Sequence, residues 1–213
     1  MNAPASLRDL ASRPSAARDV VLVDGGGTNI GSVRYALQRL GVDAQMSSDA
    51  GRIRAASHVI LPGVGAAAPG MARLRAAGLD TLLGELRQPL LGVCLGMQLL
   101  FERSEEGDTQ CLGLLPGTVR HIPQSGNVRI PHMGWNTLRI ERADPLLDGV
   151  ADGAFAYFVH GYAAPVGAST LASTEHGMRL AAVVRRGNVC GMQFHPERSA
   201  AVGARLLANF LAL

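Results

Sequence analysis

Short apolar runs alternate with amphipathic stretches through the first half of the chain, and this alternation constrains the fold more than any other feature. The runs predicted as buried strands are residues 20–23, 42–45, 58–61 and 90–93. The stretches predicted as helices are residues 30–40, 70–77, 79–87 and 95–103. Strands that alternate with helices predict a parallel sheet with helices on both faces.

The second half of the chain predicts a different kind of sheet. Its strand-like runs are residues 119–122, 137–140, 156–159, 180–184 and 189–194. A turn at 186–188 and a final helix over 199–213 complete this half, which indicates an antiparallel or mixed extension. We therefore predict an α/β fold: a single doubly wound, flavodoxin-like domain with a central mixed, mostly parallel sheet and an antiparallel extension.

The domain is expected to cover residues 20–213, because no internal repeat or linker interrupts that range. Residues 1–19 are small, polar and Arg-containing, and they lack the apolar core of a secretory signal. We predict a disordered N-terminal tail there. The Arg, Ser and Ala content leaves a transit peptide as the alternative.

Composition excludes several classes of function. All 20 basic residues are Arg, and the absence of Lys excludes Schiff-base chemistry and the lysine-containing phosphate loop. The Arg residues are scattered and only 4% of residues are aromatic, which favours a solvated surface over a nucleic-acid site. The longest uncharged stretch, 153–174, lacks the continuous apolar character of a membrane span. Three Cys without a C-x-x-C pair argue against disulfides and zinc, and indicate a cytoplasmic protein.

The run Gly92-Val93-Cys94-Leu95-Gly96 is the strongest chemical signal. It lies between a predicted buried strand and a predicted helix, as a nucleophile elbow does, with Cys in the place of Ser. A helix N-terminus stabilises a thiolate, and the Leu95 N–H can donate to an oxyanion. We predict that Cys94 is a nucleophile.

A second segment offers the base that such a nucleophile needs. His195 and Glu197 follow the last predicted strand, and in extended backbone both side chains point to the same side. With Cys94 they make a Cys-His-Glu constellation. Cys190 lies on the opposite face of its strand from His195 and is expected in the core, and Cys111 is expected to be structural.

Two glycine-rich loops follow other predicted strands. Residues 25–27 do not fit the G-x-G-x-x-G dinucleotide fingerprint, which leaves a tight strand-to-helix turn. Pro62-Gly63-Val64-Gly65 could aim backbone N–H groups at a substrate and form an oxyanion hole together with Leu95.

These motifs resemble those of the class I (triad) glutamine amidotransferases. The class motifs are LPGVG at 61–65, GVCLGMQLL at 92–100 and GMQFHPERS at 191–199. Three further motifs resemble one branch, the glutaminase subunits of imidazole glycerol phosphate synthase in histidine biosynthesis. They are FERSEEG at 101–107, PHMGWN at 131–136 and YFVHGY at 157–162. The resemblance runs from about residue 20 to the C-terminus.

The resemblance implies hydrolysis of L-glutamine by Cys94, His195 and Glu197, without metal or cofactor. The oxyanion hole would use the backbone N–H groups of Gly63 and Leu95. The residues implied in substrate binding are Gly65, Gln98, His160, Gly161 and Tyr162. Gly161 stands where Ser or Thr is more usual in the family.

The resemblance also implies a partner, because the chain has no room for a synthase domain. The branch pairs, as a heterodimer, with a separate (βα)₈-barrel cyclase that uses the ammonia. Residues on the implied partner-facing side are Asn29, Trp135, Asn136 and Tyr157; core packing is the alternative for Trp135 and Tyr157. Three other functions stay open: an amidotransferase of another pathway, a stand-alone γ-glutamyl hydrolase, and a regulatory module without chemistry.

Overall fold

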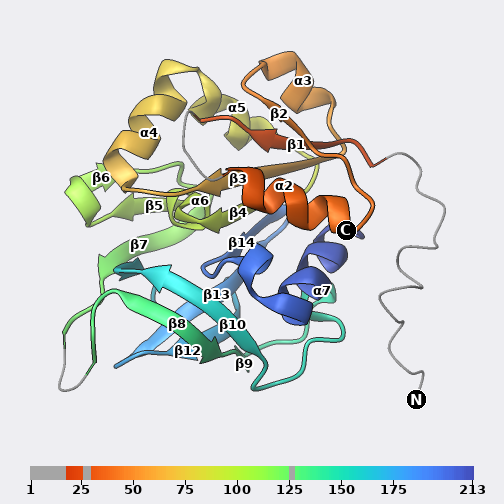
Figure 1. Cartoon of the computed structure of the whole chain (residues 1–213). Helices are drawn as coiled ribbons and strands as arrows, with labels where there is room; N and C mark the ends of the chain where they lie inside the picture. Colours follow the sequence, from red (N-terminus) through yellow and green to blue (C-terminus); the bar gives the residue numbers. More distant parts are fainter. Residues whose placement is uncertain (1–17, 26–29, 125–127) are drawn as a thin grey trace.

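An eight-stranded sheet forms the centre of the computed structural model, which describes residues 18–25, 30–124 and 128–213 (Figure 1). In spatial order its strands are β2 (Gln45–Ser47), β1 (Val20–Val23), β3 (His58–Gly63), β4 (Leu90–Cys94), β14 (Val189–Met192), β13 (Arg179–Arg186), β12 (Thr170–Glu175) and β9 (Arg139–Ile140). The first five pair in parallel, and the last three continue the sheet by antiparallel pairing. The predicted mixed, mostly parallel sheet with an antiparallel extension is confirmed.

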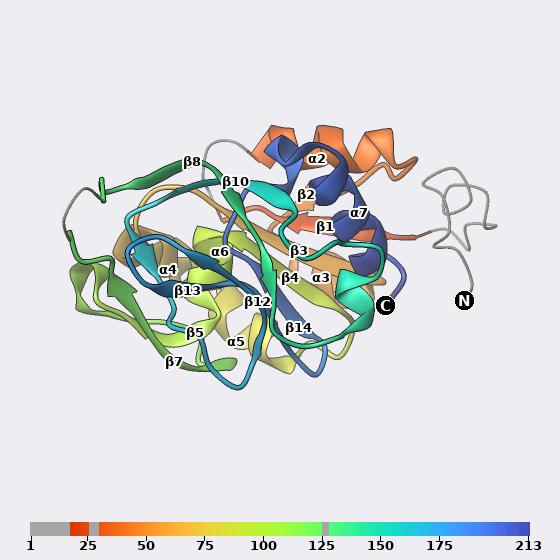
Figure 2. The ribbon, with the colours of Figure 1, turned by 90° about the horizontal axis from the view of Figure 1, so that it is seen from below.

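Helices cover both faces of this sheet (Figure 2). One face carries α2 (Ile30–Arg39) and α7 (Ala200–Phe210), and the other carries α3 (Ala50–Ala55), α4 (Ala67–Ala76), α5 (Leu79–Glu85) and α6 (Leu95–Leu99). Strand β1 shows why its sequence is an unbroken apolar run. Val20 and Leu22 pack into the core beneath α2 and α7, whereas Val21 and Val23 pack into the core beneath α4 and α5.

Two smaller sheets lie beside the central one. The first pairs β8 (His132–Thr137) with β10 (Phe155–His160) in antiparallel register. The second contains β11 (Tyr162–Ala163), β7 (Leu115–His121), β5 (Phe101–Ser104) and β6 (Thr109–Gln110). Three short 3₁₀ turns complete the described elements: η1 (Glu106–Asp108), η2 (Pro145–Leu147) and η3 (Pro196–Arg198).

Several local predictions were wrong. The second strand is Gln45–Ser47 rather than 42–45, because the chain is still turning after Gly41, whose φ is 79°. The helix predicted over 95–103 ends at Leu99, since the next residues form β5 by pairing with the distant strand β7. Strand β12 escaped prediction because three of its buried residues are polar, namely Thr170, Ser173 and Thr174.

The predicted N-terminal tail lies outside the described residues, except for Arg18 and Asp19. The carboxylate of Asp19 forms an ion pair with Arg52, at the start of the described chain. Within the described ranges, no helix has both the length and the apolar character to cross a membrane.

Candidate active site

Cys94 is the last residue of β4 and makes the sharp turn into α6, which begins at Leu95. Its φ of 54° and ψ of −113° place a non-glycine residue in a strained backbone conformation. The Cys94 Sγ lies 3.9 Å from the Val159 carbonyl oxygen of β10. The side chain is therefore raised at the carboxyl edge of the sheet, at the N-terminus of a helix, as the elbow motif predicts.

The glycines around Cys94 are required by close backbone packing. A Cβ on Gly96 would lie 1.9 Å from the Leu61 carbonyl oxygen, and one on Gly92 would lie 2.6 Å from the Gly96 carbonyl oxygen. A Cβ on Gly63 would lie 2.6 Å from the Gly96 N atom. These contacts bring β3 and its following loop directly against the start of α6, which any larger residue would prevent.

His195 and Glu197 face Cys94 from the segment after β14. The His195 Nδ1 lies 2.9 Å from Glu197 Oε1, and a hydrogen bond joins the His195 ring to Cys94. Burial lowers the pKa of His195. The hydrogen bonds and charges of Cys94 and Glu197 outweigh burial and raise the pKa to about 10. The His195 ring therefore favours the protonated form.

Ser199 fixes the backbone of this segment. Its hydroxyl donates to the His195 carbonyl oxygen (2.7 Å) and accepts from the Tyr157 N–H (3.0 Å). The His195 N–H donates to the Tyr157 carbonyl oxygen at 2.9 Å. These bonds hold η3 against β10, so that His195 is oriented by both its side chain and its main chain.

Cys94 and His195 open into a cavity of about 330 Å³. Its other lining residues are Val64, Gly65, Leu95, Gln98, Glu106, Pro131, Val159, His160, Gly161 and Tyr162. The structure thus brings all five predicted substrate-binding residues to one cavity with the predicted nucleophile and base. Gly65 has a φ of 92°, a conformation that favours glycine at this point of the wall.

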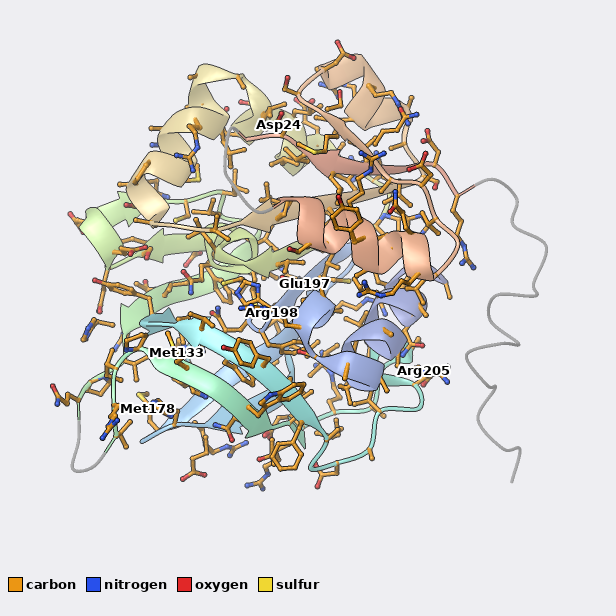
Figure 3. All side chains as sticks on the ribbon, in the orientation of Figure 1. Asp24, Met133, Met178, Glu197, Arg198 and Arg205 are labelled. Atoms are coloured by element: carbon orange, nitrogen blue, oxygen red, sulfur yellow. The ribbon has the colours of Figure 1, made fainter. Side chains whose placement is uncertain are left out.

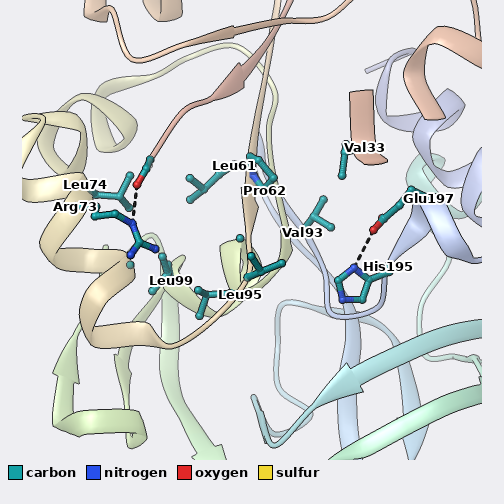
Figure 4. A pocket seen from close by; sticks show the side chains of 14 residues that line it. Val33, Leu61, Pro62, Arg73, Leu74, Val93, Leu95, Leu99, His195 and Glu197 are labelled. Carbon is teal, nitrogen blue, oxygen red and sulfur yellow. Dashed lines mark hydrogen bonds and ion pairs between the residues drawn. The ribbon is translucent and has the colours of Figure 1, made fainter. Parts of the chain in front are cut away.

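A smaller hollow of about 40 Å³ lies on another side of His195 and Glu197 (Figure 4). Gly63 and Arg73 line this hollow, and the Arg73 Nε donates to the Gly25 carbonyl oxygen at 2.7 Å. Cys94 does not line it. Gly63 therefore borders the small hollow, Val64 borders both, and Gly65 borders the large cavity.

Comparison with known proteins shows which family the chain belongs to. A family model described as class-I glutamine amidotransferase matches residues 21–213. The chain belongs to the class I glutamine amidotransferase family. This amidotransferase is 62% identical over 195 residues to the imidazole glycerol phosphate synthase subunit HisH of Xanthomonas axonopodis pv. citri (strain 306), an alignment that covers 92% of this chain and 98% of the relative.

Further relatives agree with that assignment. The subunit of the same name from Xylella fastidiosa (strain Temecula1) is 56% identical over 92% of this chain and 98% of its own. A solved glutamine amidotransferase has a TM-score of 0.70 at 24% identity, covering 90% of this chain and 97% of that one. A glutamine amidotransferase from Thermotoga maritima has a TM-score of 0.61 at 18% identity, covering 92% and 81%. These two structures share the fold.

Gln98 is buried one helical turn after Cys94 in this amidotransferase. Its Nε2 donates to the Tyr162 carbonyl oxygen (2.8 Å) and to Gln193 Oε1 (3.1 Å). Gln193 is fully buried on β14's C-terminal side, and its own Nε2 has no partner among the described residues. The amide nitrogen of Gln98 is therefore occupied in holding the cavity wall.

Glu106 is a cavity residue that the sequence prediction did not assign. It lies on η1, and its Oε2 accepts a hydrogen bond from the Ala67 N–H at the start of α4 (2.8 Å). Among the described residues, it is the one acidic side chain in the lining of the large cavity. Its motif, residues 101–107, belongs to the branch resemblance, but no local spacing predicts that its side chain lines the same cavity as Cys94.

The predicted partner-facing residues separate into two groups. Trp135 is 53% exposed and meets the Tyr157 ring edge-on, with centroids 5.8 Å apart. Asn136 points to the opposite face of β8, where its Nδ2 donates to the Glu175 carbonyl oxygen at 2.8 Å. Asn29 lies outside the described residues.

The other two cysteines lie in the core. Burial raises the pKa of the Cys190 thiol to about 12 and that of the Cys111 thiol to about 11. Neither thiol therefore competes with Cys94 as a nucleophile near neutral pH. In residues 18–25, 30–124 and 128–213, no group of three or more His, Cys, Asp or Glu side chains is arranged to hold a metal ion.

Proposed function

We propose that this chain is the glutaminase subunit of an imidazole glycerol phosphate synthase, and that it delivers ammonia to a separate cyclase. The observation that carries the proposal is that Cys94 and His195 line one cavity, while Glu197 binds the His195 ring from behind. The names of relatives that are 56% and 62% identical support the branch. A cytoplasmic location belongs to the same proposal.

In the first half-reaction, the Cys94 thiolate attacks the side-chain amide carbon of glutamine. The amide oxygen becomes an oxyanion that accepts hydrogen bonds from the Leu95 N–H and from N–H groups of the loop 63–65. Protonated His195 gives its proton to the amide nitrogen, the C–N bond breaks, and ammonia leaves. The product on the enzyme is a γ-glutamyl thioester.

In the second half-reaction, His195 takes a proton from water, and the resulting hydroxide attacks the thioester carbon. The C–S bond breaks, glutamate leaves, and the Cys94 thiolate is restored. Glu197 holds the imidazole through Nδ1 in both halves, so that the opposite nitrogen faces the reacting atoms. His195 changes its protonation state twice and returns to its starting form.

Charge in the cavity suggests how glutamine is oriented. The Glu106 carboxylate suits the α-ammonium group of the substrate, because opposite charges attract most strongly away from bulk water. The backbone of Gly161 and Tyr162 suits the α-carboxylate end. This arrangement would leave the side-chain amide directed towards Cys94.

The β8–β10 pair is the surface that we propose for the cyclase, a (βα)₈ barrel. Met133, Trp135 and Phe155 are 64%, 53% and 56% exposed on it, an unusual concentration of large apolar side chains. Arg198, from η3, lies over the Tyr157 ring at 5.3 Å from its centroid. Figure 3 shows Arg198 and Glu197 together between α2 and this pair, so the proposed interface adjoins the catalytic segment.

Glutamate release with and without the cyclase and its nucleotide ligand tests the proposal. We expect slow turnover for the subunit alone and strong stimulation in the complex. Equal turnover in both conditions would refute ammonia delivery, and no turnover in either would favour a regulatory module.

A Cys94→Ala variant sharpens this experiment. In the complex it should lose glutamine-dependent synthesis, by at least about 10³-fold, yet retain synthesis from added ammonium salts. Cys190→Ala is the matched control and should keep glutamine use in its folded fraction. Glutamine-dependent synthesis that persists in Cys94→Ala would exclude Cys94 as the nucleophile.

A further inference from the structure

Three histidine rings gather behind the glutamine cavity, and the proposed mechanism uses none of their protons. The His132 ring stacks on that of His176, with centroids 4.1 Å apart, and meets the ring of His160 edge-on at 4.9 Å. His132 and His160 are buried, and His160 also lines the cavity. Hydrogen bonds join them in a chain from Asn136 through His132 and His160 to the Tyr162 carbonyl oxygen.

The Tyr162 end fixes the proton on His160. The His160 Nδ1 lies 2.8 Å from the Tyr162 carbonyl oxygen, which can only accept, so Nδ1 carries the proton. The His160 Nε2 lies 3.0 Å from His132 Nδ1. In a neutral His160 ring, Nε2 is the acceptor, and therefore His132 Nδ1 is the donor.

The hydrogen bonds of Asn136 independently show which His132 nitrogen carries the proton. The Asn136 Nδ2 donates to the Glu175 carbonyl oxygen (2.8 Å), and its Oδ1 accepts from the Thr137 N–H (2.8 Å). A flipped amide would oppose both backbone groups, so its orientation is determined. Since Asn136 Nδ2 also lies 3.1 Å from His132 Nε2, that nitrogen is the acceptor and the His132 proton is on Nδ1.

We propose that Asn136 and His132 are positioning residues that lock His160 as a neutral imidazole with its proton on Nδ1, and so fix one wall of the glutamine site. This inference rests on the proposed function of the cavity. Both His160 nitrogens are occupied within the chain, so the ring meets bound glutamine through its carbon atoms. The polar contacts of that wall are then left to the backbone of residues 160–162.

The surroundings support neutral rings. Burial, followed by the charges of His160 and His176, lowers the pKa of His132 to about 3. Burial also lowers the pKa of His160, to about 4, although its bond to the Tyr162 carbonyl opposes the shift. The other titratable groups that act on His160 are His176 and His195, and Cys94, Glu106 and Tyr162 line the same cavity.

One shared acceptor, the Tyr162 carbonyl oxygen, connects the fixed His160 ring to α6. The Tyr162 carbonyl oxygen that accepts from His160 also accepts from Gln98 Nε2, at 2.8 Å. One residue before His160, the Val159 carbonyl oxygen faces the Cys94 thiol. A rotated His160 ring would therefore disturb the substrate wall and the support of Gln98 together.

Imidazole ¹⁵N NMR of the histidine-labelled protein, without glutamine, tests the lock directly. We expect His132 and His160 to stay neutral from pH 6 to pH 8, with the proton on Nδ1 in both. A proton on Nε2, or an imidazolium at either position in this range, would overturn the proposal. This NMR measurement does not depend on catalysis. Absence of glutamine hydrolysis in the stimulated complex would refute the proposed function instead.

Steady-state kinetics of three variants in the cyclase complex test the consequence. His132→Phe keeps a ring on His176 but removes the donor, so KM for glutamine should rise about tenfold with a smaller change in kcat. On acidification its KM should also begin to rise at a higher pH than the wild-type KM does, because the unoccupied Nε2 of His160 can then bind a proton. His132→Asn retains a donor near the Nδ1 position and should recover most of the wild-type KM.

His176→Phe is the matched control. It also replaces His by Phe, but in the stacked neighbouring ring that takes no part in the hydrogen bonds from Asn136 to Tyr162. Its KM and pH profile should match the wild type. Equal KM values for His132→Phe and His176→Phe, or no recovery in His132→Asn, would overturn the positioning role. If His132→Phe does not fold, the NMR measurement on the unmodified protein decides.

Discussion

His195 and His160 line the same cavity, yet their rings bind protons with opposite tendencies. Burial lowers the pKa of both, but His195 ends at about 10 and His160 at about 4. His195 bonds to Glu197 and Cys94, which carry or can acquire negative charge. His160 bonds to a backbone carbonyl and to another histidine, neither of which stabilises a cation as a carboxylate does.

The comparison shows that the hydrogen-bond partners of the two rings, rather than their burial, determine the protonation state of each. A protonated imidazole beside a thiolate is prepared to give its proton to a leaving group. A neutral imidazole with both nitrogens bonded can neither give nor take a proton without breaking a hydrogen bond. One side of the cavity is thus suited to proton transfer, and the other is a fixed wall.

Replacement of His195 should have the largest effect on this contrast. His195→Asn keeps a polar side chain but cannot transfer the proton, so kcat for glutamine hydrolysis should fall at least about 10³-fold. Alkylation of Cys94 by iodoacetamide near neutral pH should slow as well, because the imidazolium no longer favours the thiolate. His176→Asn is the control and should retain activity. Equal losses in both variants would remove the distinction between the two regions.

Glu197→Gln should reduce the difference in pKa between His195 and His160 without removing the base. The amide keeps the approximate shape but loses the charge that raises the pKa of His195, so an NMR titration should find that pKa well below the wild-type value. We expect kcat to fall about 10- to 100-fold. An unchanged His195 titration would show that Cys94 alone raises the pKa.

How far the sequence predicts this site depends on the range of the contacts. The elbow at Cys94 and the His195–Glu197 pair could be predicted because each follows from neighbours one or two positions away. Gln98 and Gln193 meet across 95 positions, and His132 and His160 across 28. No local period reveals such contacts, and the sequence indicated His160 only through its motif.

The same limit applies to the fold. The parallel half was predictable because each strand there is an apolar run, buried on both faces. Strand β5 was mistaken for the end of a helix, since its residues become a strand only by pairing with β7. The part of the cavity wall that carries Glu106 follows β5, so the error in the fold and the missed cavity residue have one cause.

Unfolding by urea as a function of pH should separate the two regions thermodynamically. His195 has a folded pKa above its unfolded value of about 6.5, so its stabilisation is complete below pH 6.5 and is lost as pH rises towards 10. His132 and His160 have folded pKa values of about 3 and 4, so stability falls as pH drops below 6.5.

Two variants should therefore flatten opposite limbs of the stability profile. Glu197→Gln should reduce the alkaline loss, and His132→Phe should reduce the acid loss, each measured against the same protein at pH 6.5. His176→Phe serves again as the control on the acid side. An acid limb that His132→Phe leaves as steep as in the wild type would show that the buried histidines do not govern it.

The smallest expected effect concerns Gly161, which follows His160 and lines the cavity that His195 also borders. A Cβ there would meet only Ile130 Cγ2, at 3.8 Å, so Gly161→Ser fits without moving the backbone. The added hydroxyl can bind glutamine, and one such hydrogen bond should lower KM about 2- to 10-fold with little change in kcat. Gly161→Ala adds the same Cβ without the hydroxyl and should leave KM unchanged. A matching fall in KM for Ala would assign the gain to packing, and a rise for both would mean that this wall needs its glycine beside the fixed His160 ring.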